Sequence, residues 1–143
     1  MAKLTQEEIM ALVDRAIEAR KLAYAPYSRY KVGAAVLGAD GKIYGGCNIE
    51  NASFGLTNCA ERTAFFRAIY DGERDFTKIA VVGAPGGMDA DILTAPCGVC
   101  RQVMMEFCDP ETFIIIMPDG KGGIIEILLK DLLPFGFGPN NLK

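Results

Sequence analysis

The sequence contains no histidine among its 143 residues. Any metal site in this protein therefore has to use thiol or carboxylate ligands in place of imidazole. The chain also lacks a block of lysine or arginine, and its formal net charge is −3. This charge argues against a nucleic-acid backbone or an anionic membrane as the main partner, and it favours a small ligand.

The N-terminal stretch, MAKLTQEEIMALVDRAIEARK, carries charges throughout and has no continuous apolar run. We therefore expect neither a signal peptide nor a spanning helix there, and we expect a cytoplasmic protein. Thiols stay reduced in the cytoplasm. The five cysteines are accordingly interpreted as ligands, reactive thiols or core residues, and not as a disulfide framework; they stand at positions 47, 59, 97, 100 and 108.

No internal repeat, low-complexity tract or linker divides the sequence, which predicts a single domain over residues 1–143. Hydrophobic spacing predicts helices over residues 5–23, 58–71 and about 97–107, and a brief helical turn after residue 129. Apolar runs predict a hairpin over residues 31–49, turning at Asp40 and Gly41, and strands over 78–84, 112–117 and 123–129. The order α-β-β-α-β-α-β-β predicts an α/β fold, a three-layer α/β/α sandwich with a five-stranded mixed sheet.

Cys97 and Cys100 form a Cys-Gly-Val-Cys motif, with its thiols one helical turn apart. On its own the motif is compatible with a metal site, a redox pair or plain core cysteines. Cys59 adds a third thiol, which we place at a helix N-terminus, where the partial positive charge favours the thiolate. Three protein ligands with an open fourth position are typical of catalytic zinc. Cys47 and Cys108 lack partners at ligand spacing and are expected to be buried core thiols.

Glu61 follows Cys59 by two residues. Residues at this spacing point to different sides in mid-helix, so the two can share a target only just beyond the helix end. The alternative is that Glu61 merely complements the helix dipole. In zinc deaminases the order is a ligand, one residue, a glutamate that is not a ligand, and later Pro-Cys-x-x-Cys, and this sequence has that order from Cys59 to Cys100.

At this point the sequence closely resembles the short, homotetrameric cytidine deaminases, from about Tyr24 to Phe137. The stretches that carry the resemblance are APYSRYKVGAAV, GCNIENASFGLTNCAERTA, PCGVCRQV and LLPFGF. The resemblance implies a cytidine deaminase-like fold in which Cys59, Cys97 and Cys100 bind one Zn²⁺ per subunit. It also implies hydrolytic deamination of cytidine and 2′-deoxycytidine to the uridines plus ammonia, a step of pyrimidine salvage. In that reaction a zinc-polarised water attacks C4 while Glu61 shuttles protons.

The same resemblance assigns roles around this centre. Asn48 and Glu50 correspond to residues that hold the ribose hydroxyls, and Ala60 and Tyr30 correspond to substrate contacts. Family members usually carry a phenylalanine where this chain has Tyr30, whose extra hydroxyl needs a partner.

Two further roles follow from the resemblance. Arg62 is assigned to withdraw charge from thiolate sulfur, where the alternative is an ordinary surface arginine. A C-terminal aromatic reaches a neighbouring subunit's site in the family; spacing favours Phe137 over Phe135, and local core packing is the alternative for either ring.

Three rival functions stay open from the residues alone. A non-enzymatic zinc-binding module leaves the missing fourth ligand unexplained, and a thiol redox protein gives Cys59 no part. A deaminase of another cytosine compound, such as a nucleoside antibiotic, shares the zinc and the glutamate. Action on polynucleotides is the least expected variant, because the chain is acidic and has no basic, aromatic-rich channel.

Overall fold

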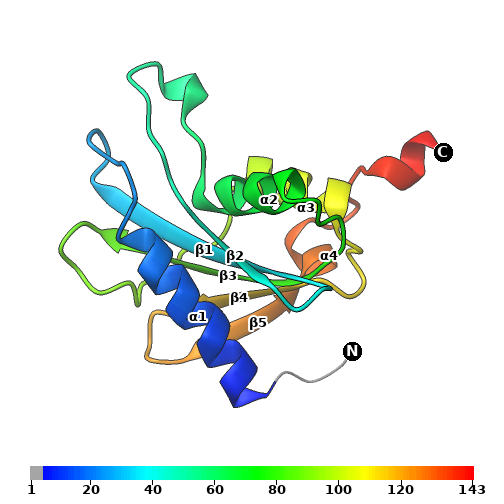
Figure 1. Cartoon of the computed structure of the whole chain (residues 1–143), viewed down its shortest axis with the longest axis horizontal. Coiled ribbons are helices and arrows are strands. Elements are labelled where there is room, and N and C mark those ends of the chain that lie inside the picture. The colour runs from blue at the N-terminus through cyan, green and yellow to red at the C-terminus, as the bar shows by residue number, and fades with distance from the viewer. Residues whose placement is uncertain (1–4) are drawn as a thin grey trace.

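A five-stranded mixed sheet lies at the centre of the computed structural model, which describes residues 5–143 (Figure 1). The strand order across the sheet is β2-β1-β3-β4-β5. β1 pairs antiparallel with β2 and β3, β3 pairs parallel with β4, and β4 pairs antiparallel with β5. This confirms the predicted mixed sheet, whose strands are β1 (Tyr30–Gly38), β2 (Ile43–Cys47), β3 (Phe76–Pro85), β4 (Ile114–Pro118) and β5 (Ile124–Leu128).

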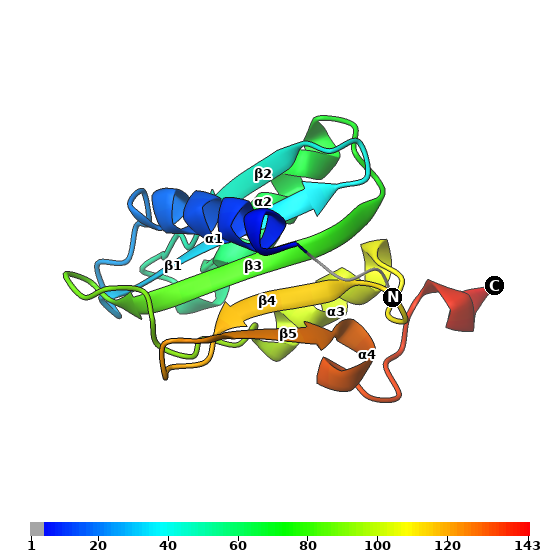
Figure 2. The same ribbon diagram turned by 90° about the horizontal axis from the view of Figure 1, so that it is seen from below.

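Helices cover both faces of the sheet. α1 (Gln6–Arg20) lies across one face, and α2 (Ala60–Tyr70) and α3 (Gly98–Phe107) lie on the other (Figures 1 and 2). The predicted three-layer α/β/α arrangement is therefore confirmed. None of the helices within residues 5–143 has the length and apolar character needed to span a bilayer.

The apolar core has two parts, one on each face of the sheet. β3 belongs to both, since Ile79 and Val81 face α2 and α3 while Ala80 and Val82 face α1. Period-two alternation places successive side chains on opposite faces. Coverage on both faces explains why β3 is apolar from Ile79 to Ala84, as the apolar run over residues 78–84 predicted.

α1 begins as predicted, because the hydroxyl of Thr5 accepts a hydrogen bond from the backbone N–H of Glu8 over 3.1 Å. It ends at Arg20, three residues before the predicted end. The backbone N–H of Tyr24 donates to the carbonyl of Asn48 over 3.0 Å, and that of Glu50 donates to the carbonyl of Tyr24 over 2.8 Å. These bonds draw the chain out of the helix and place it beside the segment that follows β2.

Three smaller features differ from the sequence-based expectations. Leu129 begins a short helix, α4 (Leu129–Leu132), and does not extend the last strand. Two 3-10 helices, η1 (Phe54–Leu56) and η2 (Pro139–Leu142), were not predicted. Cys47 is only half-buried at the end of β2, so its expected place in the core was wrong, whereas Cys108 is buried in the core as predicted.

Candidate active site

Two helix N-termini bring three cysteines together. Cys59 is the residue that caps α2, Cys97 caps α3, and Cys100 lies in the first turn of α3. The sulfur atoms of Cys59 and Cys97 are 3.7 Å apart, and those of Cys97 and Cys100 are 3.5 Å apart. Within residues 5–143 this is the only cluster of three potential ligands from histidine, cysteine and acidic residues.

The spacing of the three sulfur atoms fits one tetrahedral ion. Sulfurs bound to zinc at the usual distance of about 2.3 Å stand roughly 3.8 Å from one another. All three sulfurs here lie within 4.8 Å of one another, and both helix N-termini contribute partial positive charge to thiolate formation. The donor set therefore fits Zn²⁺ with three protein ligands.

Hydrogen bonds within the cluster favour the thiolate form of Cys59. The hydrogen bond from the Cys100 thiol, followed by the Arg62 guanidinium, lowers the pKa of the Cys59 thiol to about 5. The hydrogen bond to Cys59 and burial raise the pKa of Cys100. A divalent cation would offset the repulsion that opposes ionisation of the remaining thiols.

Glu61 is the second residue of α2 and only 4% exposed, so its carboxyl group is held inside the protein beside the thiols. Burial, with a smaller contribution from Cys59, raises the pKa of Glu61 to about 7. A carboxyl group with that pKa can both accept and donate a proton near neutral pH. An acidic residue that served only the helix dipole would not have to be buried in this way.

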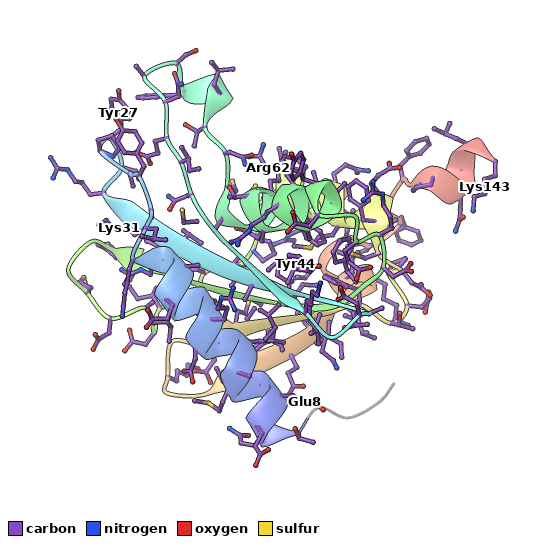
Figure 3. The ribbon with its side chains drawn as sticks, in the orientation of Figure 1. Glu8, Tyr27, Lys31, Tyr44, Arg62 and Lys143 are labelled. Carbon is purple, nitrogen blue, oxygen red and sulfur yellow. The ribbon has the colours of Figure 1, made fainter. Side chains whose placement is uncertain are left out.

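Arg62 follows on the same turn as the third residue of α2, and Figure 3 labels it beside that helix. Its Nη2 donates to the sulfur of Cys59 over 3.2 Å and lies 3.5 Å from the carbonyl oxygen of Thr57. Its Nε is buried without a hydrogen-bond partner among residues 5–143. The guanidinium is therefore directed at the thiols, unlike that of an ordinary surface arginine.

The segment after β2 runs beside the start of α2. Ile49 and Asn58 exchange two backbone hydrogen bonds of 2.9 Å each, which place Asn48 and Glu50 next to the cysteine that caps α2. The Oδ1 atom of Asn48 accepts from the Val32 N–H over 2.9 Å, and its Nδ2 donates to the Tyr30 carbonyl over 2.8 Å. A side-chain amide has two N–H donors, so one N–H of Asn48 is still available to a ligand.

Glu50 is fixed by the loop that follows α1. Its carboxylate accepts from the backbone N–H groups of Tyr27 and Ser28 over 2.9 and 3.1 Å, and from the hydroxyl of Ser28. The hydroxyl of Ser28, followed by the two backbone donors, lowers the pKa of Glu50. A charged carboxylate held in one orientation is suited to accept hydrogen bonds from the hydroxyl groups of a sugar.

Tyr30 and Ala60 belong to two different elements, β1 and α2. Ala60 is fully buried as the first residue of α2, where backbone N–H groups have no partner within the helix. Tyr30 begins β1, and its hydroxyl lies 2.6 Å from Oγ1 of Thr94. The extra hydroxyl of Tyr30 therefore has the partner that it needs.

The two C-terminal phenylalanines are exposed, Phe135 fully and Phe137 by 57%, which rules out local core packing for both rings. Nε2 of Gln102 donates to the carbonyl of Phe137 over 2.8 Å and so attaches the tail to α3. Beyond that point the tail projects from the body of the molecule (Figures 1 and 2).

Some residues near the site were not singled out from the sequence. Tyr27, Ser28, Glu50, Phe54 and Thr57 line one cleft, where the rings of Tyr27 and Phe54 meet edge to face with centroids 5.6 Å apart. Tyr27, Ser28 and Phe54 stand within the motif stretches, but none has a side chain that signals chemistry by its type. Thr94 carries no sequence signal at all, since its role depends on a contact with a distant strand.

Comparison with known proteins decides the family. The model of the cytidine and deoxycytidylate deaminase zinc-binding region matches residues 6–117. The chain belongs to this family. It is 51% identical over 132 residues to a cytidine deaminase of Halalkalibacterium halodurans, an alignment that covers 92% of this chain and 96% of that protein. It is 45% identical over 136 residues to a cytidine deaminase of Sporosarcina psychrophila, covering 95% and 96%.

Solved structures of the deaminase family agree with the fold. The cytidine deaminase of Burkholderia pseudomallei superimposes with a TM-score of 0.80 at 48% identity, covering 94% of this chain and 100% of that one. The resemblance inferred from the motifs and the predicted α/β fold are thus confirmed. The predicted zinc cofactor is confirmed by the zinc-binding family model together with the cluster of three thiols.

Proposed function

We propose that this protein is a zinc-dependent cytidine deaminase that converts cytidine and 2′-deoxycytidine to uridine and 2′-deoxyuridine with release of ammonia. One observation carries the proposal. Three thiols within 4.8 Å of one another lie at converging helix N-termini, and a buried glutamate stands two residues after the first of them.

Cys59, Cys97 and Cys100 would hold the metal, and Glu61 is the catalytic acid and base. When bound, zinc supplies a Lewis acid that lowers the pKa of water toward neutrality. Glu61 accepts a proton from the attacking water and delivers it to N3 of the cytosine ring. Glu61 then accepts the proton of the hydroxyl group now bonded to C4 and delivers it to the amine, so that the C4–N bond breaks, the C4 carbonyl forms and ammonia leaves.

Asn48 and Glu50 are proposed to recognise the ribose. The available N–H of Asn48 would donate to a sugar oxygen, and the carboxylate of Glu50 would accept from sugar hydroxyls. Tyr30 would pack against the base, which would also meet the backbone of Ala60 at the start of α2. Arg62 would withdraw charge from Cys59 through its hydrogen bond to that sulfur.

We further propose that the protein is a homotetramer of one catalytic domain per chain, over residues 1–143, and that it works in the cytoplasm. Support for assembly comes from large apolar side chains at the surface, which in a monomer would stay in water. These include Phe66 and Tyr70 on α2, Val99 on α3, and Phe137 in the tail. We propose that Phe137, and not Phe135, completes the site of a neighbouring subunit.

The rival functions account for less of this site. A redox pair needs only two thiols, whereas the sulfur of Cys59 lies as near to Cys97 as a third metal ligand would. A non-enzymatic zinc module gives no reason to bury Glu61 beside the metal ligands. Against an antibiotic substrate, we propose that Asn48 and Glu50 bind the hydroxyl groups of an ordinary ribose.

The test is the ultraviolet change that distinguishes cytidine from uridine, recorded with purified protein before and after prolonged chelation. We expect conversion that is lost with the metal and restored by stoichiometric zinc. Zinc-loaded protein of confirmed assembly that leaves cytidine unchanged would overturn the proposal, and other cytosine compounds would then be tried.

A further inference from the structure

We propose that Thr94 is a positioning residue that orients the ring of Tyr30 against the cytosine base, and so sets the affinity of the enzyme for its substrate. This inference rests on the proposed function. It concerns a hydrogen bond between side chains that are 64 positions apart in the sequence.

The direction of this hydrogen bond follows from the proton count. Oγ1 of Thr94 lies 2.6 Å from the Tyr30 hydroxyl, 3.2 Å from the carbonyl oxygen of Gly83 and 3.4 Å from that of Ile92. Thr94 has a single hydroxyl proton, and carbonyl oxygens can only accept. Thr94 therefore donates to β3 at Gly83, and the Tyr30 hydroxyl donates to Thr94.

These two hydrogen bonds connect the ring of Tyr30 to β3, the central strand of the sheet. The carbonyl of Tyr30 is also held by Nδ2 of Asn48 over 2.8 Å. Tyr30 is thus anchored through its backbone to a proposed ribose contact and through its hydroxyl to β3. A phenylalanine at this position would keep only the first anchor.

Gly83 makes the room in which the two side chains meet. A Cβ atom at Gly83 would lie 3.0 Å from Cγ2 and Oγ1 of Thr94 and 3.0 Å from Cε1 of Tyr30. All three contacts are tighter than ordinary van der Waals packing. Thr94 and Tyr30 therefore meet directly over the backbone of Gly83, in space that a side chain at position 83 would take up.

Thr94 also precedes Cys97 by three residues in the segment that leads from β3 to α3. The same hydroxyl group therefore connects the strand that carries the base-contacting ring to the segment that carries a metal ligand. Because the bond acts on the orientation of Tyr30, its loss should weaken substrate binding in the ground state and the transition state alike. Such a loss raises KM and leaves kcat nearly unchanged.

The experiment measures kcat and KM for cytidine, with zinc content, in the wild-type protein and in Thr94→Val, Thr94→Ser, Tyr30→Phe and the double variant Tyr30→Phe/Thr94→Val. Thr94→Val leaves the tyrosine hydroxyl without its acceptor and should raise KM about tenfold, the loss expected of one hydrogen bond with an unpaired partner. Thr94→Ser keeps the hydroxyl and should keep the wild-type KM. Tyr30→Phe should raise KM by a smaller factor, about threefold, because no unpaired hydroxyl remains.

The double variant separates orientation from simple loss of stability. Because phenylalanine has no hydroxyl to satisfy, Tyr30→Phe/Thr94→Val should have a KM no higher than that of Thr94→Val alone. Thr77→Val, a threonine at the exposed start of β3, is the matched control and should behave as wild type.

Unchanged KM in Thr94→Val, or a double variant whose KM rises by the product of the two single effects, would overturn the inference. If Thr94→Val does not fold, an unchanged KM in Tyr30→Phe overturns it equally. A wild-type, zinc-loaded protein that fails to deaminate cytidine would overturn the proposed function and this inference with it. If the wild-type protein deaminates cytidine normally and the variants have the wild-type KM, this inference is overturned while the proposed function stands.

Discussion

Nη2 of Arg62 lies 3.2 Å from the sulfur of Cys59, the residue that caps the same helix three positions earlier. Three thiolates around one divalent cation leave a net charge of −1, which weakens the pull of the metal on electron density. A guanidinium that donates to one of the sulfurs withdraws part of this charge. We therefore propose that Arg62, which is not a metal ligand, tunes the acidity of water bound at the metal centre.

We expect Arg62→Gln to lower kcat about tenfold or more, the scale of a hydrogen bond to a charged group, while KM changes little. Steady-state kinetics on zinc-loaded protein measures this. Arg67→Gln, in the last turn of α2 and exposed, is the control that removes an arginine from the same helix. Wild-type kcat in Arg62→Gln at full zinc occupancy would contradict the role.

Glu61→Gln removes the proton carrier and keeps the shape of the side chain. Positioned acid and base groups contribute about 10²–10⁴ in rate, so the barrier should rise by about 3–5 kcal/mol while nucleoside binding persists. Single-turnover kinetics and equilibrium dialysis with cytidine check both parts. Glu7→Gln is the matched control, because Glu7 is also an acidic first-turn residue but is exposed on α1. If Glu61→Gln and Glu7→Gln turned over cytidine at similar rates, Glu61 would not be the proton carrier and would only complement the dipole of α2.

Zinc content tests the ligand set one cysteine at a time. Serine at position 59, 97 or 100 removes a thiolate, and the stoichiometry should fall from one zinc per chain to well below one after gel filtration. Cys47→Ala should keep the full zinc content, since Cys47 lies outside the cluster. Metal analysis by mass spectrometry gives the result, and retention of one zinc per chain in Cys97→Ser would remove that residue from the set.

The sequence predicted the thiol cluster from two local signals, which the zinc-deaminase order of residues from Cys59 to Cys100 joined into one site. Cys97 and Cys100 are one turn apart, and Cys59 stands at a helix start that hydrophobic periodicity alone places within two residues. The apolar run of β3, from Ile79 to Ala84, likewise predicted that both faces of this strand are buried. Each of these signals depends on a few neighbouring residues.

Contacts between distant segments could not be predicted in the same way. The end of α1 depends on the pairing of Tyr24 with Asn48, and the orientation of Tyr30 depends on Thr94. Cys47 is less buried than free cysteines usually are, because β2 is an edge strand. A threonine or tyrosine hydroxyl can form hydrogen bonds with many groups, so the residue type alone does not show which partner it has in the folded protein.

Close packing of β2 on α2 gives a stability prediction. A Cβ atom at Gly46 would lie 2.4 Å from the backbone nitrogen of Ala64 and 2.6 Å from the carbonyl oxygen of Ala60. Gly46→Ala should therefore push α2 outward and lower the free energy of unfolding by roughly 1–3 kcal/mol, the usual cost of overpacking. At neighbouring Gly45 the nearest atom would be 3.5 Å away, an ordinary contact, so Gly45→Ala is the matched control. Equal urea midpoints for the two variants would contradict the close approach.

If active sites are shared between subunits, the two phenylalanines of the C-terminal tail should differ in their effect on activity. Phe137→Ala should lower activity strongly while light scattering still shows a tetramer, whereas Phe135→Ala should stay close to wild type. The exposed ring of Phe137 has no core of its own chain to stabilise, so an effect on catalysis points to another chain.

Subunit mixing then decides whether Phe137 acts in a neighbour. Phe137→Ala and Glu61→Gln proteins are each nearly inactive under the proposal, because every site lacks either the ring or the carboxyl group. When the two variants are co-expressed and form mixed tetramers, some sites receive Glu61 from one chain and Phe137 from its neighbour. Activity should return in proportion to the number of those sites. If Phe137 acted within its own chain, each wild-type Glu61 would still stand in a chain without the ring. Mixed tetramers without recovered activity would therefore assign Phe137 to its own subunit.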